Sequence, residues 1–196
     1  MQSQPNVGKV TAAESLARDR LRCDVEGLTL RRSGAIVVIA VVLLLGGCRS
    51  VSLRDGVVST PDTRYRIGPV PADWHQVNLN ESDLAWVTSP STYAFWVNST
   101  CKEYEDVPLV ALNRQLLIGF TDVQKLAQRT DSLDGREALL SHYIAKIDGM
   151  PRELGLVVVK KDRCIYDFAY VAPVGGYGVH AGEFQALFNG FASEPR

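Results

Sequence analysis

Two short turns in the second half of the chain constrain the fold more than any other sequence feature. Asp134-Gly135 lies between two long strand-like runs, and Asp162-Arg163 lies between two more. A two-residue turn of this kind between such runs predicts a β-hairpin. Two hairpins in succession therefore predict an antiparallel meander of four strands. The four runs are residues 123–133, 136–148, 152–161 and 164–172.

Shorter strands and one helix are expected before this meander. Residues 84–88 and 92–100 flank Ser89-Pro90-Ser91 and predict a further hairpin. Leucines spaced three and four residues apart predict a helix over residues 108–118, which Gly119 ends. Two more strands are expected at residues 64–68 and 74–79.

The end of the chain predicts a second helix with one apolar face, made of Phe184, Leu187, Phe188 and Phe191. Apolar residues occupy both alternating positions of 139–147 and 164–172, so both faces of the sheet should be covered. We therefore expect an α+β fold, an antiparallel sheet with helices packed on both faces in an α/β/α sandwich.

This order of elements is similar to the Mog/PsbP-like α/β/α domain, including the Pro71-x-x-Trp74 segment before the first hairpin. The resemblance spans most of residues 64–195 and brings no catalytic residues. It implies a binding or assembly module, since that superfamily consists mainly of such modules.

An apolar run near the start of the chain, Ala35 to Leu45, follows the basic pair Arg31-Arg32. A helix needs about 20 apolar residues to cross a bilayer, so this run is too short to span one. Basic residues before a short apolar run are typical of a secretory signal peptide. An uncleaved signal anchor is the alternative.

The run ends in Leu45-Gly46-Gly47-Cys48, which resembles the lipobox of bacterial lipoproteins. The resemblance implies that the Cys48 thiol accepts diacylglycerol, that the signal peptide is cleaved before Cys48, and that acyl chains such as palmitate anchor the protein in a membrane. The alternative is a free cysteine. Because Arg49 rather than Asp follows the cysteine, the resemblance favours the periplasmic face of the outer membrane.

We thus divide the chain into four parts. Residues 1–29 fit no signal peptide, and we interpret them as a mis-assigned start or, alternatively, a cytoplasmic tail. Residues 30–47 are the predicted lipoprotein signal peptide. Residues 48–63 are polar and are expected to form a lipidated tether. Residues 64–196 are expected to form a single globular domain.

Charge and cysteines limit the partners and the compartment. Of the 21 Lys and Arg, six precede Cys48, and of the 22 Asp and Glu, four do, so residues 48–196 carry a net charge of −3. We expect no nucleic-acid partner, because no basic stripe is present. Export would let Cys101 and Cys164 form a disulfide, and two buried free thiols are the alternative.

The search for chemistry yields no catalytic residues, no cofactor and no metal site. His75, His142 and His180 lie far apart in the sequence and match no metal-ligand spacing. The glycines around Tyr177 match no nucleotide-binding motif, and we interpret residues 175–178 as a flexible connection.

Four aromatic residues form the candidate binding surface, with core packing as the alternative: Trp74, Trp86, Tyr93 and Trp96. We therefore predict a membrane-anchored lipoprotein with a non-catalytic periplasmic domain that binds an envelope protein. The alternative is an envelope hydrolase that uses scattered Asp and His residues. A cleft that gathers His142 or His180 with two carboxylates would favour the hydrolase.

Overall fold

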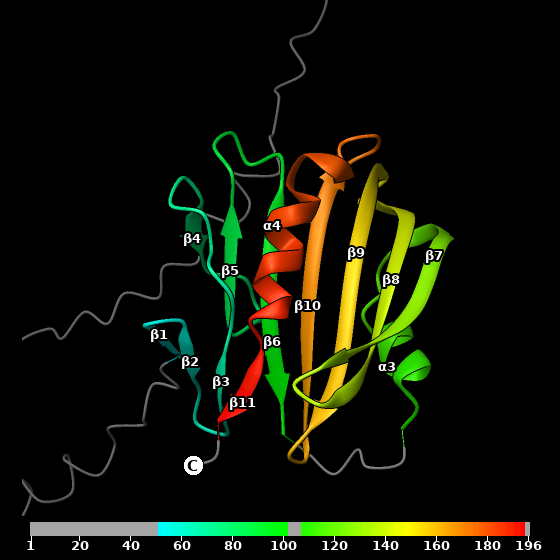
Figure 1. The fold of residues 1–196 in the computed structure, drawn as a ribbon. Helices are drawn as coiled ribbons and strands as arrows, with labels where there is room; N and C mark the ends of the chain where they lie inside the picture. The colour runs from blue at the N-terminus through cyan, green and yellow to red at the C-terminus, as the bar shows by residue number, and fades with distance from the viewer. Residues whose placement is uncertain (1–50, 102–106, 195–196) are drawn as a thin grey trace, which may run out of the picture. The chain divides into compact units, whose positions relative to one another are not determined.

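A seven-stranded antiparallel sheet organises the domain (Figure 1). The computed structural model describes residues 51–101 and 107–194, so Cys48 and the predicted segments 1–29 and 30–47 lie outside the described residues. The described residues belong to one compact unit. Within the described ranges, no helix has the length and apolar character needed to cross a bilayer.

The strand order of the large sheet is β4-β5-β6-β10-β9-β8-β7, and every neighbouring pair is antiparallel. The predicted hairpin before the first helix is present, since β5 pairs with β6. The strands are β4 (His75–Val77), β5 (Leu84–Val87), β6 (Ala94–Thr100), β7 (Thr121–Leu133), β8 (Arg136–Ile147), β9 (Met150–Lys161) and β10 (Cys164–Pro173).

The meander from β7 to β10 confirms the two hairpins predicted from Asp134-Gly135 and Asp162-Arg163. A third two-residue turn, Asp148-Gly149, joins β8 to β9. Both residues of all three turns have positive φ, the backbone geometry that matches the twist of a hairpin. The edge strand β7 is irregular, because its pairing with β8 shifts register twice, between Thr121 and Gln124 and between Lys125 and Ala127.

A second, four-stranded sheet has the order β1-β2-β3-β11. It corrects the predicted tether, because residues 52–59 form two strands and Val58 is fully buried. Alternating polar and apolar residues in two three-residue strands give too short a pattern to be distinguished from a linker. The strands are β1 (Ser52–Arg54), β2 (Val57–Ser59), β3 (Arg64–Arg66) and β11 (Ala192–Glu194).

The described residues contain two α-helices, one on each face of the large sheet. Helix α4 (Tyr177–Asn189) packs Phe184 and Leu187 into the same core as Val157, whereas α3 (Leu109–Gln115) packs Leu112 against Val158. Val157 and Val158 are adjacent on β9 and point to opposite faces. The predicted α/β/α sandwich is therefore found only in part, because α3 is short and its strand contacts are with β8 and β9.

The main core lies between α4 and the large sheet and continues to the small sheet. It is rich in aromatic rings: Tyr65 meets Tyr166 edge to face at 5.1 Å between ring centres, and Phe191 packs on Tyr166 at 4.8 Å. The sequence predicted Phe191 on the apolar face of the last helix. In the structure α4 ends at Asn189, so Phe191 lies after the helix. Burial of these rings fixes the position of α4 over β9 and β10.

Candidate functional site

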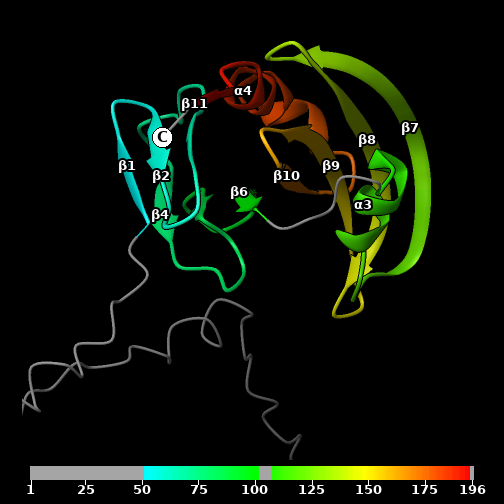
Figure 2. The same cartoon turned by 90° about the horizontal axis from the view of Figure 1, so that it is seen from below.

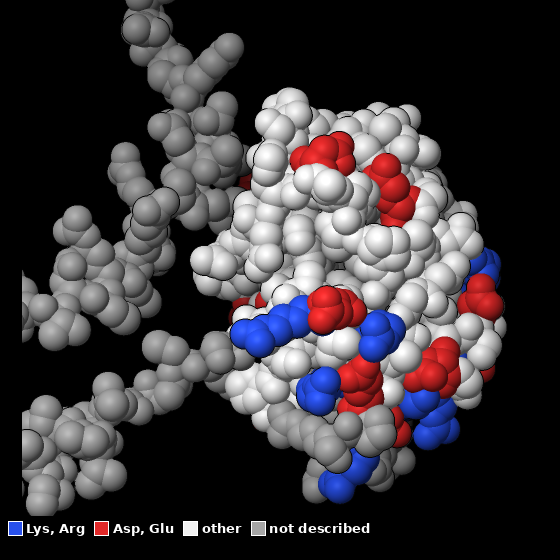
Figure 3. Space-filling view, turned by 60° about the vertical axis from the view of Figure 1, so that its left-hand side comes forward, with Lys and Arg blue, Asp and Glu red and all other residues white. Residues whose placement is uncertain are grey.

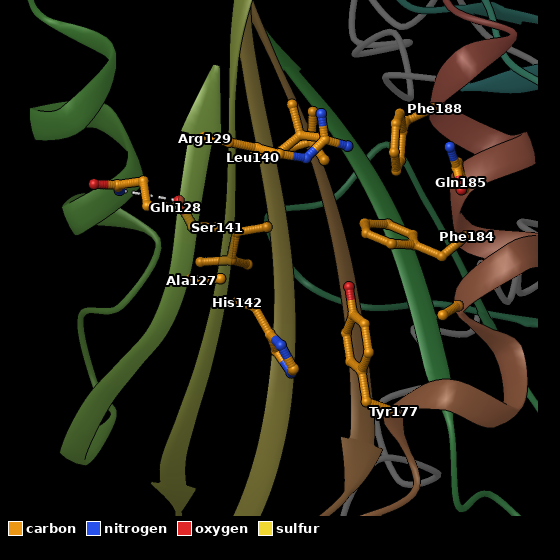
Figure 4. A pocket seen from close by; sticks show the side chains of 13 residues that line it. Ala127, Gln128, Arg129, Leu140, Ser141, His142, Tyr177, Phe184, Gln185 and Phe188 are labelled. Carbon is orange, nitrogen blue, oxygen red and sulfur yellow. Dashed lines mark hydrogen bonds between the residues drawn. The ribbon is translucent and has the colours of Figure 1, made fainter. Parts of the chain in front are cut away.

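An open cleft with a volume of about 380 Å³ lies between α4 and the strands β7, β8 and β9. Figure 2 shows the long arc of β7 at this edge of the sheet, and Figure 4 shows the two walls of the cleft facing each other. Most of the lining is apolar, which is usual for sites that bind small molecules. The lining residues are Ala127, Gln128, Arg129, Leu140, Ser141, His142, Leu156, Val157, Tyr177, Ala181, Phe184, Gln185 and Phe188.

Strand alternation decides which side chains of β7 and β8 face α4. Arg129 pairs with Leu140, and both point toward the helix (Figure 4). Their neighbours Gln128 and Ser141 point away from the helix, and the Gln128 Nε2 donates a hydrogen bond to the Ser141 Oγ at 3.0 Å. Opposite Arg129 and Leu140, Phe188 of α4 forms the apolar wall.

Tyr177, the first residue of α4, lies flat on strand β9 because the residue beneath it is Gly155. A Cβ atom at Gly155 would lie 2.5 Å from the Tyr177 hydroxyl and 3.1 Å from the Phe184 Cε1. Both distances are shorter than van der Waals contact, so a larger residue would displace the ring. The glycine therefore allows the Tyr177 hydroxyl to point into the cleft.

His142 stacks on Tyr177, with 4.0 Å between ring centres and 28° between ring planes. The His142 Nε2 atom is buried, makes no hydrogen bond, and lies 3.5 Å from the Glu153 Oε2. The other carboxylate oxygen of Glu153 accepts a hydrogen bond from the Gly175 N–H at 2.9 Å. Glu153 thus fixes the turn that precedes α4.

Among the described residues that line the cleft, Arg129 carries the one Lys or Arg charge. The guanidinium contacts the Asp131 carboxylate at 2.5 Å, and both side chains are about half exposed. Burial raises the pKa of the Tyr177 hydroxyl; the negative charge of Glu153 raises it further, and the positive charge of Arg129 opposes the rise. Tyr177 therefore stays protonated and available as a hydrogen-bond donor.

The predicted aromatic surface is not found, which is a correction, because three of its four residues, Trp74, Trp86 and Tyr93, pack in or against one core cluster. Trp74 and Trp86 are buried in the main core, and Trp74 stacks on Phe95 at 4.0 Å between ring centres. Trp96 lies on the opposite face of the sheet, next to Ala169. Tyr93 is partly buried and packs its ring against His180 at 4.7 Å. The aromatic residues are thus mainly packing residues, the alternative that the sequence had left open.

The histidines also lie apart, and each has its own surroundings. His75 is on the edge strand β4 and is exposed. The His180 Nδ1 lies 2.6 Å from the Glu183 Oε2, in the first half of α4. In the described ranges, His142 and His180 each have one carboxylate within 4 Å, so the cleft with two carboxylates that would favour a hydrolase is not found there. The described residues also include no group of three or more His, Cys, Asp or Glu that could hold a metal ion.

The two cysteines of the domain form the disulfide that the sequence led us to expect. Cys101 follows β6 and Cys164 begins β10, with 4.1 Å between their Cα atoms. Because Thr100 pairs with Ile165, the antiparallel register brings the two cysteines opposite each other. The disulfide therefore closes the end of the β6–β10 pair.

A second polar site lies on the face of the sheet opposite α4. Asp167 of β10 pairs in register with Asn98 of β6, and its side chain is almost fully buried. Burial raises the pKa of the Asp167 carboxyl to about 7; the negative charge of Asp83 adds to the rise, and a hydrogen bond from Asn98 opposes it. This buried acid does not line the cleft.

Charge is distributed unevenly over the molecule. Residues 67–101, 107–113 and 164–194 contain no Lys or Arg, so β4, β5, β6, β10 and α4 carry none. In Figure 3, the visible Lys and Arg gather around the lower part of the domain. In the small sheet, the Glu194 carboxylate pairs with Arg64 at 3.2 Å and with Arg66 at 3.0 Å.

Comparison with known proteins shows the fold only. No family model matches the sequence, and no curated protein matches it significantly. The solution structure of cyanobacterial PsbP (CyanoP) from Synechocystis sp. PCC 6803 is similar with a TM-score of 0.52 and 11% identity, over 84% of this chain and 99% of that chain. The domain therefore has a PsbP-like fold.

Two further solved structures are similar at a lower level. A protein of unknown function from Pseudomonas aeruginosa has a TM-score of 0.49 and 13% identity, over 75% of this chain and 98% of that chain. LpqN of Mycobacterium tuberculosis, which is involved in cell envelope biogenesis, has a TM-score of 0.48 and 12% identity, over 68% of this chain and 86% of that chain. Neither likeness is close enough to specify a function.

Sequence reasoning named Phe184, Phe188 and His142, which line the cleft, but missed the roles of Arg129, Gly155 and Tyr177. Tyr177 and Gly178, which we had placed in a flexible connection, form the first turn of α4. Arg129 and Gly155 carry no local motif, because their role arises only when α4 lies across the meander. The one local signal was a tyrosine between glycines directly after a strand.

Proposed function

We propose that this protein is a lipid-anchored envelope protein whose domain is a non-catalytic binding module that uses the cleft between α4 and the meander. The observation that carries the proposal is the cleft itself, which is open, mostly apolar and bordered by a few polar groups. Such a combination gives a bound molecule both contact area and orientation. The PsbP-like fold is compatible with this role but does not specify it.

The anchor in this proposal is Cys48, at the end of the lipobox-like sequence. Several acyl chains hold a protein stably at a membrane, whereas one chain gives marginal binding. Strand β1 begins at Ser52, four positions after Cys48. Four residues span at most about 14 Å, so an anchored domain would lie close to the bilayer, without the long tether that we had expected.

Acylation and membrane association test the anchor. Cys48→Ser should abolish labelling by radioactive palmitate and leave the protein unprocessed or released from the membrane fraction. Cys23→Ser is the matched control, because Cys23 lies in the segment that we interpret as dispensable. Membrane association and labelling of the Cys48→Ser variant at the original level would overturn the anchor. Separation of inner and outer membranes tests the expected outer-membrane location.

Partner capture tests the binding role. Ala181 lines the cleft from α4, so Ala181→Trp should fill it, whereas Val179→Trp places the same side chain on an exposed position of the same helix. Affinity purification of the lipidated protein from membranes should recover an envelope component with wild type and Val179→Trp but not with Ala181→Trp. Equal recovery with all three would show that the cleft is not the binding site.

A further inference from the structure

We infer that the cleft binds an amphipathic carboxylate, with its apolar part between α4 and the sheet and its carboxylate at Arg129 and Tyr177. The inference rests on the proposed function, that the domain is a binding module, and specifies the chemical class of its ligand. It is carried by the charges, walls and size of the cleft.

The charges that line the cleft favour an anion. Among the described residues that line it, Arg129 is the one Lys or Arg, and there is no Asp or Glu. A guanidinium has five N–H donors, and the contact to Asp131 is made by Nη1. That pair is about half exposed and contributes little stability, so a ligand carboxylate can compete for the guanidinium.

The second donor is the Tyr177 hydroxyl. It points into the cleft from the start of α4 (Figure 4), and its pKa is raised, so it keeps its proton. Glu153, whose charge acts on this tyrosine, is nearly buried, accepts a hydrogen bond from the Gly175 N–H and does not line the cleft. An anion between Arg129 and Tyr177 would thus meet two donors and no carboxylate among the lining residues.

The residues of the two walls favour a ligand with an apolar portion. Phe184 and Phe188 form the helix side, and Leu140 and Val157 form the sheet side. The volume of about 380 Å³ is near the lower end of the range for small-molecule sites, about 300–1,000 Å³. The size suits a short chain or a single ring rather than a long acyl chain.

The test compares octanoate with octanol, which share a chain and differ in the charged group. Isothermal titration calorimetry is performed on the full chain carrying Cys48→Ser, with wild-type and substituted clefts. Octanoate should bind more tightly than octanol to the wild-type cleft. Arg129→Gln should weaken octanoate binding about tenfold or more, because a hydrogen bond to a charged group is lost, and leave octanol binding unchanged.

Matched variants make the result specific to the cleft. Lys125→Gln removes a positive charge from the same strand, but Lys125 pairs with Tyr143 and donates to Gln128, on the face away from α4, so octanoate binding should not change. Tyr177→Phe should weaken octanoate binding about two- to tenfold. Ala181→Trp should abolish binding of both compounds. Melting temperatures show that each variant is folded.

Three results would overturn the inference: no octanoate binding, equal octanoate affinity in wild type and Arg129→Gln, or octanoate binding that survives Ala181→Trp. These failures concern the ligand class alone. The proposed binding function would remain supported if Ala181→Trp still abolished partner capture. If Ala181→Trp did not affect capture, the proposed binding function would be refuted independently of the ligand class.

Discussion

Replacing the buried acid Asp167 by asparagine should stabilise the protein at neutral and alkaline pH. The side chain is 7% exposed, and burial raises the pKa of its carboxyl from 3.8 to about 7. A tenfold change in proton affinity corresponds to about 1.4 kcal/mol. The folded protein therefore loses about 4 kcal/mol of stability when this group must ionise in the folded state.

The sign follows from proton binding in the two states. Between about pH 4 and pH 7 the folded state keeps the Asp167 proton while the unfolded state has released it, so stability falls as the pH rises through this range. The substituted asparagine has no proton to release, and its amide oxygen can still accept the hydrogen bond from Asn98. Asp167→Asn should therefore resemble wild type near pH 4 and exceed it by up to about 4 kcal/mol above pH 7.

Urea unfolding at several pH values between about 4 and 8, under non-reducing conditions, measures this difference. Asp131→Asn is the control, because Asp131 is exposed and the Arg129 guanidinium lowers the pKa of its carboxyl. The reasoning is refuted if the free energy of unfolding of Asp167→Asn falls with rising pH as steeply as that of wild type.

Three further predictions concern stability. Reduction of the disulfide, which closes a loop of 63 residues, should lower the free energy of unfolding by about 4 kcal/mol, measured by urea unfolding with and without reductant; equal midpoints would contradict it. Tyr143→Phe removes the donor to the buried Asn113 Oδ1 at 2.6 Å and should cost about 1–3 kcal/mol in the same assay, whereas no change would show that the bond is not needed. Gly68→Ala places a Cβ 1.9 Å from the Ala186 carbonyl oxygen and should lower the melting temperature, while Gly182→Ala, where a Cβ meets nothing within 4 Å, should raise it slightly; equal effects would refute the packing argument.

The meander was predictable because its signals are local. Asp134-Gly135 and the runs beside it specify a hairpin within 27 residues of sequence, whatever the rest of the chain does. Strand β11 was not predictable, because Ala192–Glu194 is short and becomes a strand only through its pairing with β3, more than 120 residues earlier. The same holds for β1 and β2, which gain their stability from the small sheet.

The candidate site was less predictable than the fold. The residue type of Trp74 and Trp86 suggested a binding surface. Their size and apolar surface instead place them in the core. Arg129, Gly155 and Tyr177 come from three elements, and their proximity depends on where α4 lies over the meander. Such a juxtaposition leaves no spacing in the sequence from which it could be inferred.

The irregular pairing of β7 has a consequence for assembly. A long edge strand with free backbone groups can recruit a strand from another molecule and start aggregation. In β7 the exposed apolar residues Val123 and Leu126 lie within the stretch where the register shifts, so a foreign strand cannot keep its ladder of hydrogen bonds beside them. The charges of Lys125 and Arg129 oppose such docking as well. Edge-to-edge pairing with another molecule is thereby discouraged over residues 121–127 of β7.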